Sequence, residues 1–332
     1  MILKRRRVML AALAVAAFGA LGTLYLMPRH GVCVDRNLMF WRAHVRATPL
    51  RNNVYMLSAY GTDLVQGNTT ALVGDDGVLL VDPGHPEMVG KERAALPDLK
   101  DPRVRLVVDS HGHFDHACAN SQLFDDGAII IGHGSIWNYL AEASSWHSRR
   151  RGDAPQVTFE NALTLRFDGE QVRLIHTPPA HTEGDTITVF PRANVIHTGD
   201  IFVNGTFPYM ENSDIDGYIA AEELLLKLAD DNTLIVPGHG PLARKADVQK
   251  SLDRMREVRK RIALLIDQGL TRKQMLARHP LDDLQPGPSR EVLGSQAVAG
   301  FVFTSMTKAL KRAGKIVVPH VTPARAVRSF HK

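Results

Sequence analysis

Cysteine is scarce in this sequence, which has only two, Cys33 and Cys118, among 332 residues. Two cysteines are too few for a disulfide-based scaffold, and the sequence leaves open whether they pair with each other. Internal repeats and low-complexity segments are also absent, which excludes repeat architectures. With 44% hydrophobic and 23% charged residues, the composition is instead typical of a globular protein with one large or two small domains.

A basic excess is missing outside the first 29 residues. The formal charge of +5 equals the five basic residues of this segment, which contains no acid: Lys4, Arg5, Arg6, Arg7 and Arg29. The rest of the chain is neutral and lacks the positive charge that is typical of a nucleic-acid-binding surface. We therefore expect a small-molecule substrate and no nucleic acid as the partner, while the oligomeric state is not predicted.

Residues 1–29 form a leader with a basic start, an apolar stretch from Val8 to Met27, and Pro28 after it. The pattern predicts a signal peptide or a membrane anchor. The apolar stretch of about 20 residues can span a bilayer, whereas signal-peptide cores run to roughly 7–15 residues, so an anchor is slightly favoured. The arginine run weakly resembles a twin-arginine signal. Either form predicts a periplasmic or otherwise extracytoplasmic body, with the uncleaved form anchored in the inner membrane.

The remaining chain divides into three parts. Residues 30–50 show no clear hydrophobic period and are interpreted as a lead-in segment. Residues 51–268 contain short apolar runs and amphipathic segments that predict strands and helices of an α/β domain. Residues 269–332 predict a C-terminal helical extension with a proline-rich break and no catalytic chemistry.

Four candidate metal ligands lie within six residues, directly after the apolar run 103–109: His111, His113, Asp115 and His116. Side chains two positions apart on an extended segment point to the same side, so His111 and His113 can share one ion. Asp115 and His116 then turn toward a second ion. A single histidine is more often a hydrogen-bonded core or surface residue, but such a cluster in an apolar setting needs coordination to offset its desolvation. The motif therefore indicates metal binding.

Ligand-type residues beside glycine or proline also follow three later strands: His181, Asp200 and His239. Any one of them alone would be interpreted as a turn residue, but the same chemistry at successive strand ends is difficult to attribute to chance. Asp82 also ends a predicted strand. It is either a turn former, which Pro83 and Gly84 favour, or a carboxylate that orients the histidine cluster.

Two loops are candidates for substrate contact. The connection from residue 61 to 67 carries Leu64 and Val65 at its tip. Residues 136–151 contain Trp137, Trp146 and a run of three arginines. This second segment is either a solvated helix end or a lid that holds an anionic substrate.

In this order, the chain resembles the metallo-β-lactamase-fold hydrolases over about residues 53–268, and it fills all seven of their ligand positions: His111, His113, Asp115, His116, His181, Asp200 and His239. The resemblance implies a four-layer αββα sandwich with the metals at one edge. It also implies a first zinc on His111, His113 and His181. A second zinc would lie on Asp115, His116 and His239. Asp200 would bridge the two ions or bind the second.

Two positions depart from the familiar secreted β-lactamases. Asp200 stands where many of those enzymes have a zinc-binding cysteine; in this the chain is similar to glyoxalase II and lactonases, which have aspartate there. Val203 stands where the β-lactamases often have a lysine for the substrate carboxylate. The resemblance implies an exported enzyme that opens an amide or ester, a candidate β-lactamase with two zinc ions. The alternatives are a glyoxalase II-like thioesterase or lactonase, or an iron-dependent enzyme of a sulfur or quinoprotein pathway on the same fold; iron and manganese stay open as metals.

The residue types suit hydrolysis. Neutral imidazoles and carboxylates bind zinc, and bound zinc lowers the pKa of water to about 7, which makes hydroxide available at neutral pH. Asp115, beside the nucleophile, is the candidate catalytic residue, because a carboxylate there can orient the nucleophile and pass a proton to the leaving group.

Overall fold

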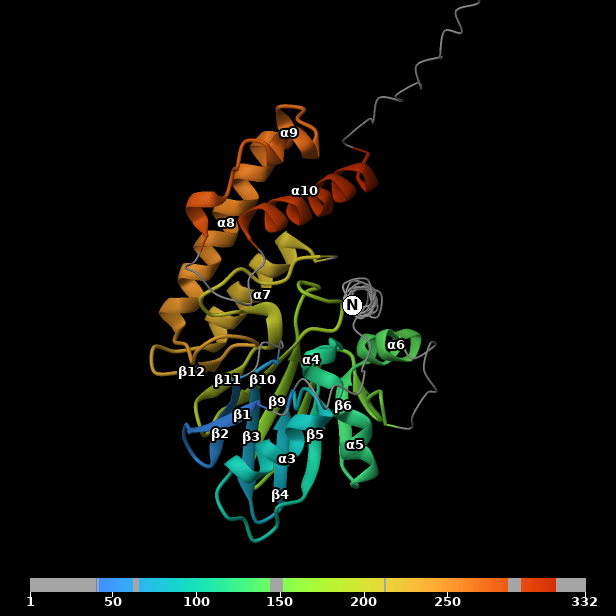
Figure 1. Cartoon of the computed structure of the whole chain (residues 1–332), viewed down its shortest axis with the longest axis vertical. Coiled ribbons are helices and arrows are strands. Elements are labelled where there is room, and N and C mark those ends of the chain that lie inside the picture. Colours follow the sequence, from blue (N-terminus) through green and yellow to red (C-terminus); the bar gives the residue numbers. More distant parts are fainter. Residues whose placement is uncertain are drawn as a thin grey trace, which may run out of the picture.

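The computed structural model describes residues 40, 42–61, 66–143, 152–211, 213–285 and 294–314 (Figure 1). The predicted leader, Cys33, Leu64, Val65 and Trp146 lie outside these residues. None of the helices described here combines the length and the apolar character needed to cross a membrane. Cys118 is buried, and no cysteine in the described ranges is a free thiol.

The first sheet has seven strands in spatial order β1 to β7. The strands are β1 (His44–Pro49), β2 (Val54–Tyr60), β3 (Thr69–Gly74), β4 (Gly77–Val81), β5 (Val104–Val108), β6 (Ile129–His133) and β7 (Val157–Phe159). Strands β1 to β4 form an antiparallel meander, and β4 to β7 are parallel. The parallel half places the ends of β4 and β5 side by side, which brings Asp82 next to the segment that starts at Asp109.

The second sheet has five strands in the order β12-β11-β10-β9-β8. They are β8 (Ala162–Phe167), β9 (Glu170–His176), β10 (Thr186–Phe190), β11 (Val195–His197) and β12 (Leu234–Val236). β11 and β12 are parallel and the other pairs antiparallel. Every residue of β10, β11 and β12 is buried, because one face packs on the first sheet and the other lies under helices.

Helices cover both outer faces of the two sheets, so the predicted αββα sandwich is confirmed (Figure 1). On the side of the first sheet lie α3 (Pro86–Ala95), α4 (Phe114–Ala117), α5 (Asn120–Asp125) and α6 (Gly134–Ala143). On the side of the second sheet lie α7 (Ile215–Leu228), α8 (Lys245–Asp267), α9 (Arg272–Leu276) and α10 (Ser295–Arg312), and two short 3-10 helices are η2 (Gly199–Ile201) and η3 (Asp282–Leu284). The inner core between the sheets is aliphatic and aromatic, with Leu79, Val108 and Phe190 fully buried.

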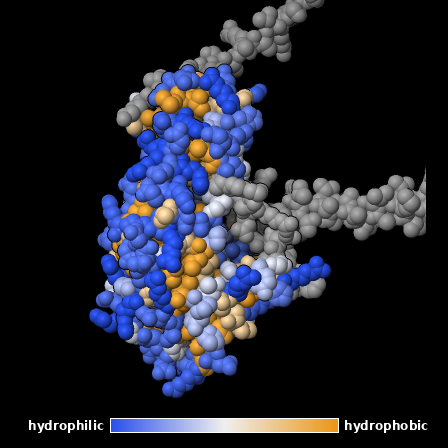
Figure 2. Space-filling model, turned by 90° about the vertical axis from the view of Figure 1, so that its left-hand side faces the viewer, coloured by the Kyte–Doolittle hydropathy of each residue, from blue (hydrophilic) through white to orange (hydrophobic). Residues whose placement is uncertain are grey.

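The end of α8, with α9 and α10, extends past the end of the sandwich at which α4 lies (Figure 1). On the face seen in Figure 2 the surface is mainly hydrophilic, with apolar atoms gathered over the sheets and on these helices. α8 begins at Lys245, because Asp247 accepts a hydrogen bond from the backbone N–H of Arg244 and caps the helix there.

Two strands were not predicted. Residues 44–49, which the sequence analysis placed in the lead-in segment, form β1 and pair along their whole length with β2. β1 is an edge strand with exposed and half-buried residues, so it lacks the apolar run that marks the other strands. β7 is short, and two of its three residues are exposed. Both were missed because edge strands bury little apolar surface.

A buried acid between α7 and α8 gives a pH-dependent stability. Burial raises the pKa of Glu222 to about 8 against an ordinary 4.5, although Ser251 donates a hydrogen bond to it at 2.6 Å. The folded state therefore holds a proton that the unfolded state releases, so stability is lost as the pH rises from about 4.5 to about 8. We expect Glu222→Gln to remove this loss, on the order of 1 kcal/mol per pH unit within that window.

The measurement is urea unfolding of the parent and Glu222→Gln between pH 5 and pH 9. Glu223→Gln is the matched control, because Glu223 lies next in the same helix and pairs with Arg256 at an exposed position. Parallel stability curves for the parent and Glu222→Gln would show that Glu222 is ionised in the folded protein.

Candidate metal centre

The seven predicted ligands come from four places in the fold and meet at one edge of the sandwich. β5 leads into His111 and His113, and α4 carries Asp115 and His116. His181 lies on the loop between β9 and β10, Asp200 lies in η2 after β11, and His239 follows β12. Since β4 and β5, and β11 and β12, are parallel pairs, their carboxyl ends deliver these side chains to the same edge.

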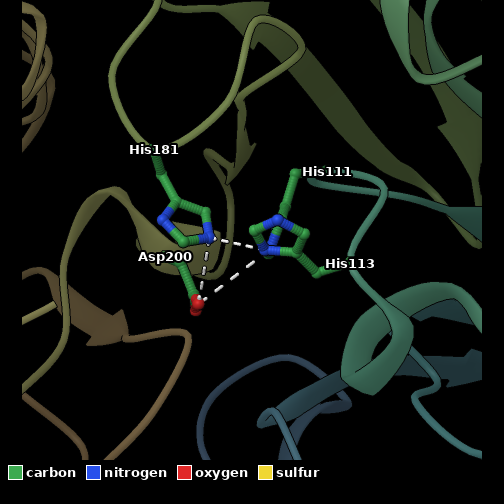
Figure 3. Close-up of side chains that lie close together, drawn as sticks. All are labelled: His111, His113, His181 and Asp200. Atoms are coloured by element: carbon green, nitrogen blue, oxygen red, sulfur yellow. Dashed lines mark hydrogen bonds and ion pairs between the residues drawn. The ribbon is translucent and has the colours of Figure 1, made fainter. Parts of the chain in front are cut away.

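Three histidines converge on one point, with Asp200 beside them (Figure 3). Nδ1 of His113 lies 3.1 Å from Nε2 of His111 and 2.7 Å from Nε2 of His181. Burial lowers the pKa of His111 well below its ordinary value and that of His181 to about 3. These imidazoles are therefore neutral and keep the nitrogen lone pairs that a metal ion requires.

A second group lies on the other side of Asp200 and consists of Asp115, His116 and His239. Oδ2 of Asp115 lies 3.1 Å from Nε2 of His239 and 3.5 Å from Nε2 of His116. Burial opposes charge on His116 and His239, but the carboxylates of Asp200 and Asp115 outweigh it. They hold the pKa of His116 well above its ordinary value and raise the pKa of His239 to about 10. The group thus has the negative charge that attracts a cation in place of these protons.

Asp200 faces both groups with different oxygens. Oδ2 lies 3.4 Å from Nε2 of His181, and Oδ1 lies 3.3 Å from Nε2 of His116 and 3.5 Å from Nε2 of His239. Oδ1 of Asp200 and Nε2 of His116 are both buried, and neither has a hydrogen-bond partner. Buried polar atoms without partners are costly. A metal ion bound by the second group would satisfy both atoms, so the residues of this group fit a metal ion.

Asp82 lies in a turn, and its carboxylate also contacts the histidine cluster. Its Oδ2 accepts hydrogen bonds from Nδ1 of His116 at 2.8 Å and from the hydroxyl of Ser110 at 2.6 Å, and lies 3.0 Å from Nε2 of His197. Its Oδ1 accepts from the backbone N–H of Ser110 at 2.7 Å. Asp82 is fully buried, at φ 57°, in the turn that Pro83 begins. It therefore orients His116 from behind.

Three residues that orient the ligands were missed in the sequence. His197 ends β11 and connects Asp82 to Thr70 of β3, whose hydroxyl lies 2.9 Å from Nδ1 of His197. The hydroxyl of Tyr218, from α7, lies 2.9 Å from Nδ1 of His181. Ser110 is the third, through its bonds to Asp82. One indication of such a role was present in the sequence: His197 is a polar residue in a short strand that is otherwise apolar and buried.

The predicted substrate residues are less well placed. Trp137 is half exposed and lines a shallow hollow beside β7 with Pro155 and Thr158. Tyr139, two residues later in α6, faces a candidate ligand instead: its ring centroid lies 5.9 Å from that of His113. Val203 is buried. Substrate contacts by Leu64, Val65 and Trp146 stay predictions, because these residues lie outside the described part.

Comparison with known proteins decides the family. The profile of the "Metallo-beta-lactamase superfamily" matches residues 62–239, which is more than half of the chain. The chain belongs to the metallo-beta-lactamase superfamily. The metallo-beta-lactamase fold and the hydrolase class that the sequence predicted are thereby confirmed, and the histidine and aspartate cluster is the superfamily's candidate metal site.

Relatives within the superfamily differ in activity. The chain is 24% identical over 217 residues to "Metallo-beta-lactamase type 2" of Bacillus sp. (strain 170), covering 63% of this chain and 81% of the relative. It is 27% identical over 187 residues to "Hydroxyacylglutathione hydrolase GloC" of Haemophilus influenzae, covering 51% of this chain and 84% of the relative. A solved metallo-beta-lactamase from Pontibacter korlensis superimposes with a TM-score of 0.55 at 18% identity, over 64% of this chain and 99% of that one. This last likeness supports the fold alone.

Proposed function

We propose that the protein is an exported hydrolase with two zinc ions that cleaves esters or thioesters of small molecules. The observation that carries the proposal is the position of Asp200, whose two oxygens face a group of three histidines and a group of Asp115, His116 and His239. Zinc ions held there would supply Lewis acidity and an acidified water. This donor set, all nitrogen and carboxylate oxygen, suits zinc.

Asp115 supplies the proton chemistry. Burial opposes its ionisation, but His116 and His239 hold the pKa of Asp115 below its ordinary value, so it is a carboxylate at neutral pH. A carboxylate at this position can accept a hydrogen bond from the attacking water and transfer the proton to the leaving group. Tyr218 and Asp82 fix the rings of His181 and His116, so the ligands need no rearrangement before the reaction.

Esters and thioesters are favoured over β-lactams because of residue 203. A cation there would bind the carboxylate that β-lactams carry, but Val203 is apolar and buried. The hydroxyacylglutathione hydrolase relative, named for a thioester-type activity, supports the same choice. β-Lactam cleavage is the second candidate, since relatives and a structural neighbour are metallo-beta-lactamases. We propose slow turnover for that substrate class.

The test combines metal analysis with substrate comparison on the full chain. We expect about two zinc ions per chain, and kcat/KM for a chromogenic thioester at least tenfold above that for a chromogenic cephalosporin. A content of one iron per chain, or no cleavage of ester, thioester or β-lactam by the zinc form, would exclude this function. Export is tested separately by fusing a reporter after Arg51, where activity confined to the cytoplasm would contradict it.

A further inference from the structure

Two tyrosine rings lie at the open side of the metal centre. The ring centroid of His113 lies 5.9 Å from that of Tyr139 of α6 and 6.5 Å from that of Tyr209. The ring centroid of Tyr209 also lies 6.5 Å from that of His181. His113 is the half-buried ligand of the three histidines, whereas His111 and His181 are buried. The tyrosines are 39% and 43% exposed. Apolar ring surface therefore borders the place where a substrate carbonyl must approach.

The backbone of Tyr209 and the ring of Tyr139 are held in position by the structure around the ligands. The carbonyl oxygen of Tyr209 lies 3.0 Å from Nδ1 of His181 and also accepts hydrogen bonds from the hydroxyls of Ser213 and Tyr218. The ring of Tyr139 packs over Gly112, where an added Cβ would lie only 2.7 Å from Cδ1 of the ring. Fixed rings bind an apolar group at a lower entropic cost than mobile ones.

The C-terminal extension continues this aromatic surface. Phe301 of α10 lies 6.1 Å from the ring of Tyr209, and its ring is half-buried. The hydroxyl of Ser305, one helical turn later, donates to the carbonyl of Ser213 at 2.9 Å. The sequence predicted no catalytic chemistry for this extension, but these contacts show that α10 reaches the residues next to the ligands.

An exposed carboxylate lies beside one of the two tyrosines. Among the residues that the structure describes, no lysine or arginine forms an ion pair with Asp82, Asp115 or Asp200. The hydroxyl of Tyr209 donates to the carboxylate of the exposed Glu211. A carboxylate on a substrate group beside Tyr209 would meet that negative charge, whereas a neutral group would not.

We propose that Tyr139, Tyr209 and Phe301 form an acyl-binding wall, which selects esters and thioesters whose acyl part is an uncharged aliphatic chain or aromatic ring. The inference rests on the proposed hydrolase function and narrows its substrate class. An apolar chain gains affinity with each methylene that it buries, about three- to fourfold per methylene. The wall thus predicts a preference for longer acyl chains.

The experiment uses nitrophenyl esters of acetate, butyrate, hexanoate and octanoate with the zinc-loaded full chain. We expect kcat/KM to rise by about three- to fourfold per methylene until the wall is covered. Phe301→Ala and Tyr139→Ala should flatten this rise while zinc content stays within about twofold of the parent. Leu264→Ala, which removes an exposed apolar side chain from α8, is the control and should keep the full rise.

A binding measurement separates this proposal from the hydrolase function. Calorimetry with neutral alkyl hydroxamates of the same lengths should show Kd falling in the same proportion, and a terminal carboxylate on the chain should abolish the gain. If acetate ester is cleaved but neither kcat/KM nor hydroxamate affinity depends on chain length, the acyl-binding wall is overturned and the hydrolase function is retained. Length-dependent hydroxamate binding without ester cleavage supports the wall and overturns the hydrolase, and absence of both effects overturns both.

Discussion

Replacing Asp200 by alanine should lower kcat for ester or thioester cleavage by on the order of a thousandfold or more, because several kcal/mol of transition-state stabilisation depend on metal ions held in place. Oδ1 and Oδ2 of this residue face the two ligand groups separately, at 3.3 Å from His116 and 3.4 Å from His181. Its loss removes a donor from both groups at once. We therefore expect lower zinc affinity at both sites, whereas a variant of His116 should weaken the second site alone.

Kinetics and metal content of three variants test this prediction. Asp200→Asn keeps the size but loses the charge, and Asp200→Cys keeps a donor for one group only. We expect metal affinity to fall in the order Asp, Cys, Asn, Ala. Aspartate offers a charged oxygen to each group, a thiolate offers one charged donor, an amide offers one neutral oxygen, and alanine offers no donor. An Asp200→Ala protein that retains two zinc ions and activity within tenfold of the parent would show that Asp200 binds neither ion.

The clustering of the candidate ligands could be predicted from the sequence because their positions follow from local rules. His111, Asp200 and His239 each come shortly after a buried strand, and parallel strand ends meet at one edge whatever the rest of the fold does. The division of Asp200 between two groups could not be derived this way. It depends on the rotation of one carboxylate, which packing between η2, α4 and the loop after β12 decides.

The residues that contact the candidate ligands or Asp82 from distant parts of the sequence were not predicted, for a related reason. His197 meets Asp82 across 115 positions of the chain, and Tyr218 meets His181 across 37. Tyr209 and Phe301 are brought together by the packing of α10, which no period in the sequence reveals. Long-range pairs of this kind have no local signature, whereas the αββα layers follow from runs of apolar residues.

Asp82 combines both of its predicted roles in one residue. Its positive φ of 57° is the turn conformation that aspartate tolerates better than most residues, and its carboxylate is aimed at His116 by the same turn. A residue at this position must therefore satisfy the backbone and the metal centre together. A substitution that keeps the turn but removes the carboxylate should therefore affect both stability and metal binding.

Asp82→Asn should reduce the free energy of unfolding by about 3–5 kcal/mol and weaken zinc binding at the second site by about 10- to 100-fold. Burial opposes the charge of Asp82, but His116 and His197 outweigh it and hold its pKa below the ordinary range, so the buried carboxylate is ionised and paired. A neutral amide leaves these partners with one acceptor oxygen in place of two. Asparagine tolerates a positive φ, so the turn is retained and the loss measures the carboxylate.

Glu92→Gln is the matched control, because Glu92 of α3 is also buried but burial raises its pKa to about 8. Glu92 is thus neutral at pH 7, and its amide should cost little there. The contribution of Asp82 has the opposite sign: it is present above about pH 4 and lost as the pH falls through its lowered pKa. The gap in unfolding free energy between parent and Asp82→Asn should therefore narrow below pH 4, as followed by urea unfolding of the metal-free proteins. A gap that is constant from pH 7 to pH 3, or equal losses in both variants, would mean that Asp82 stabilises the fold through packing and that its charge does not orient His116.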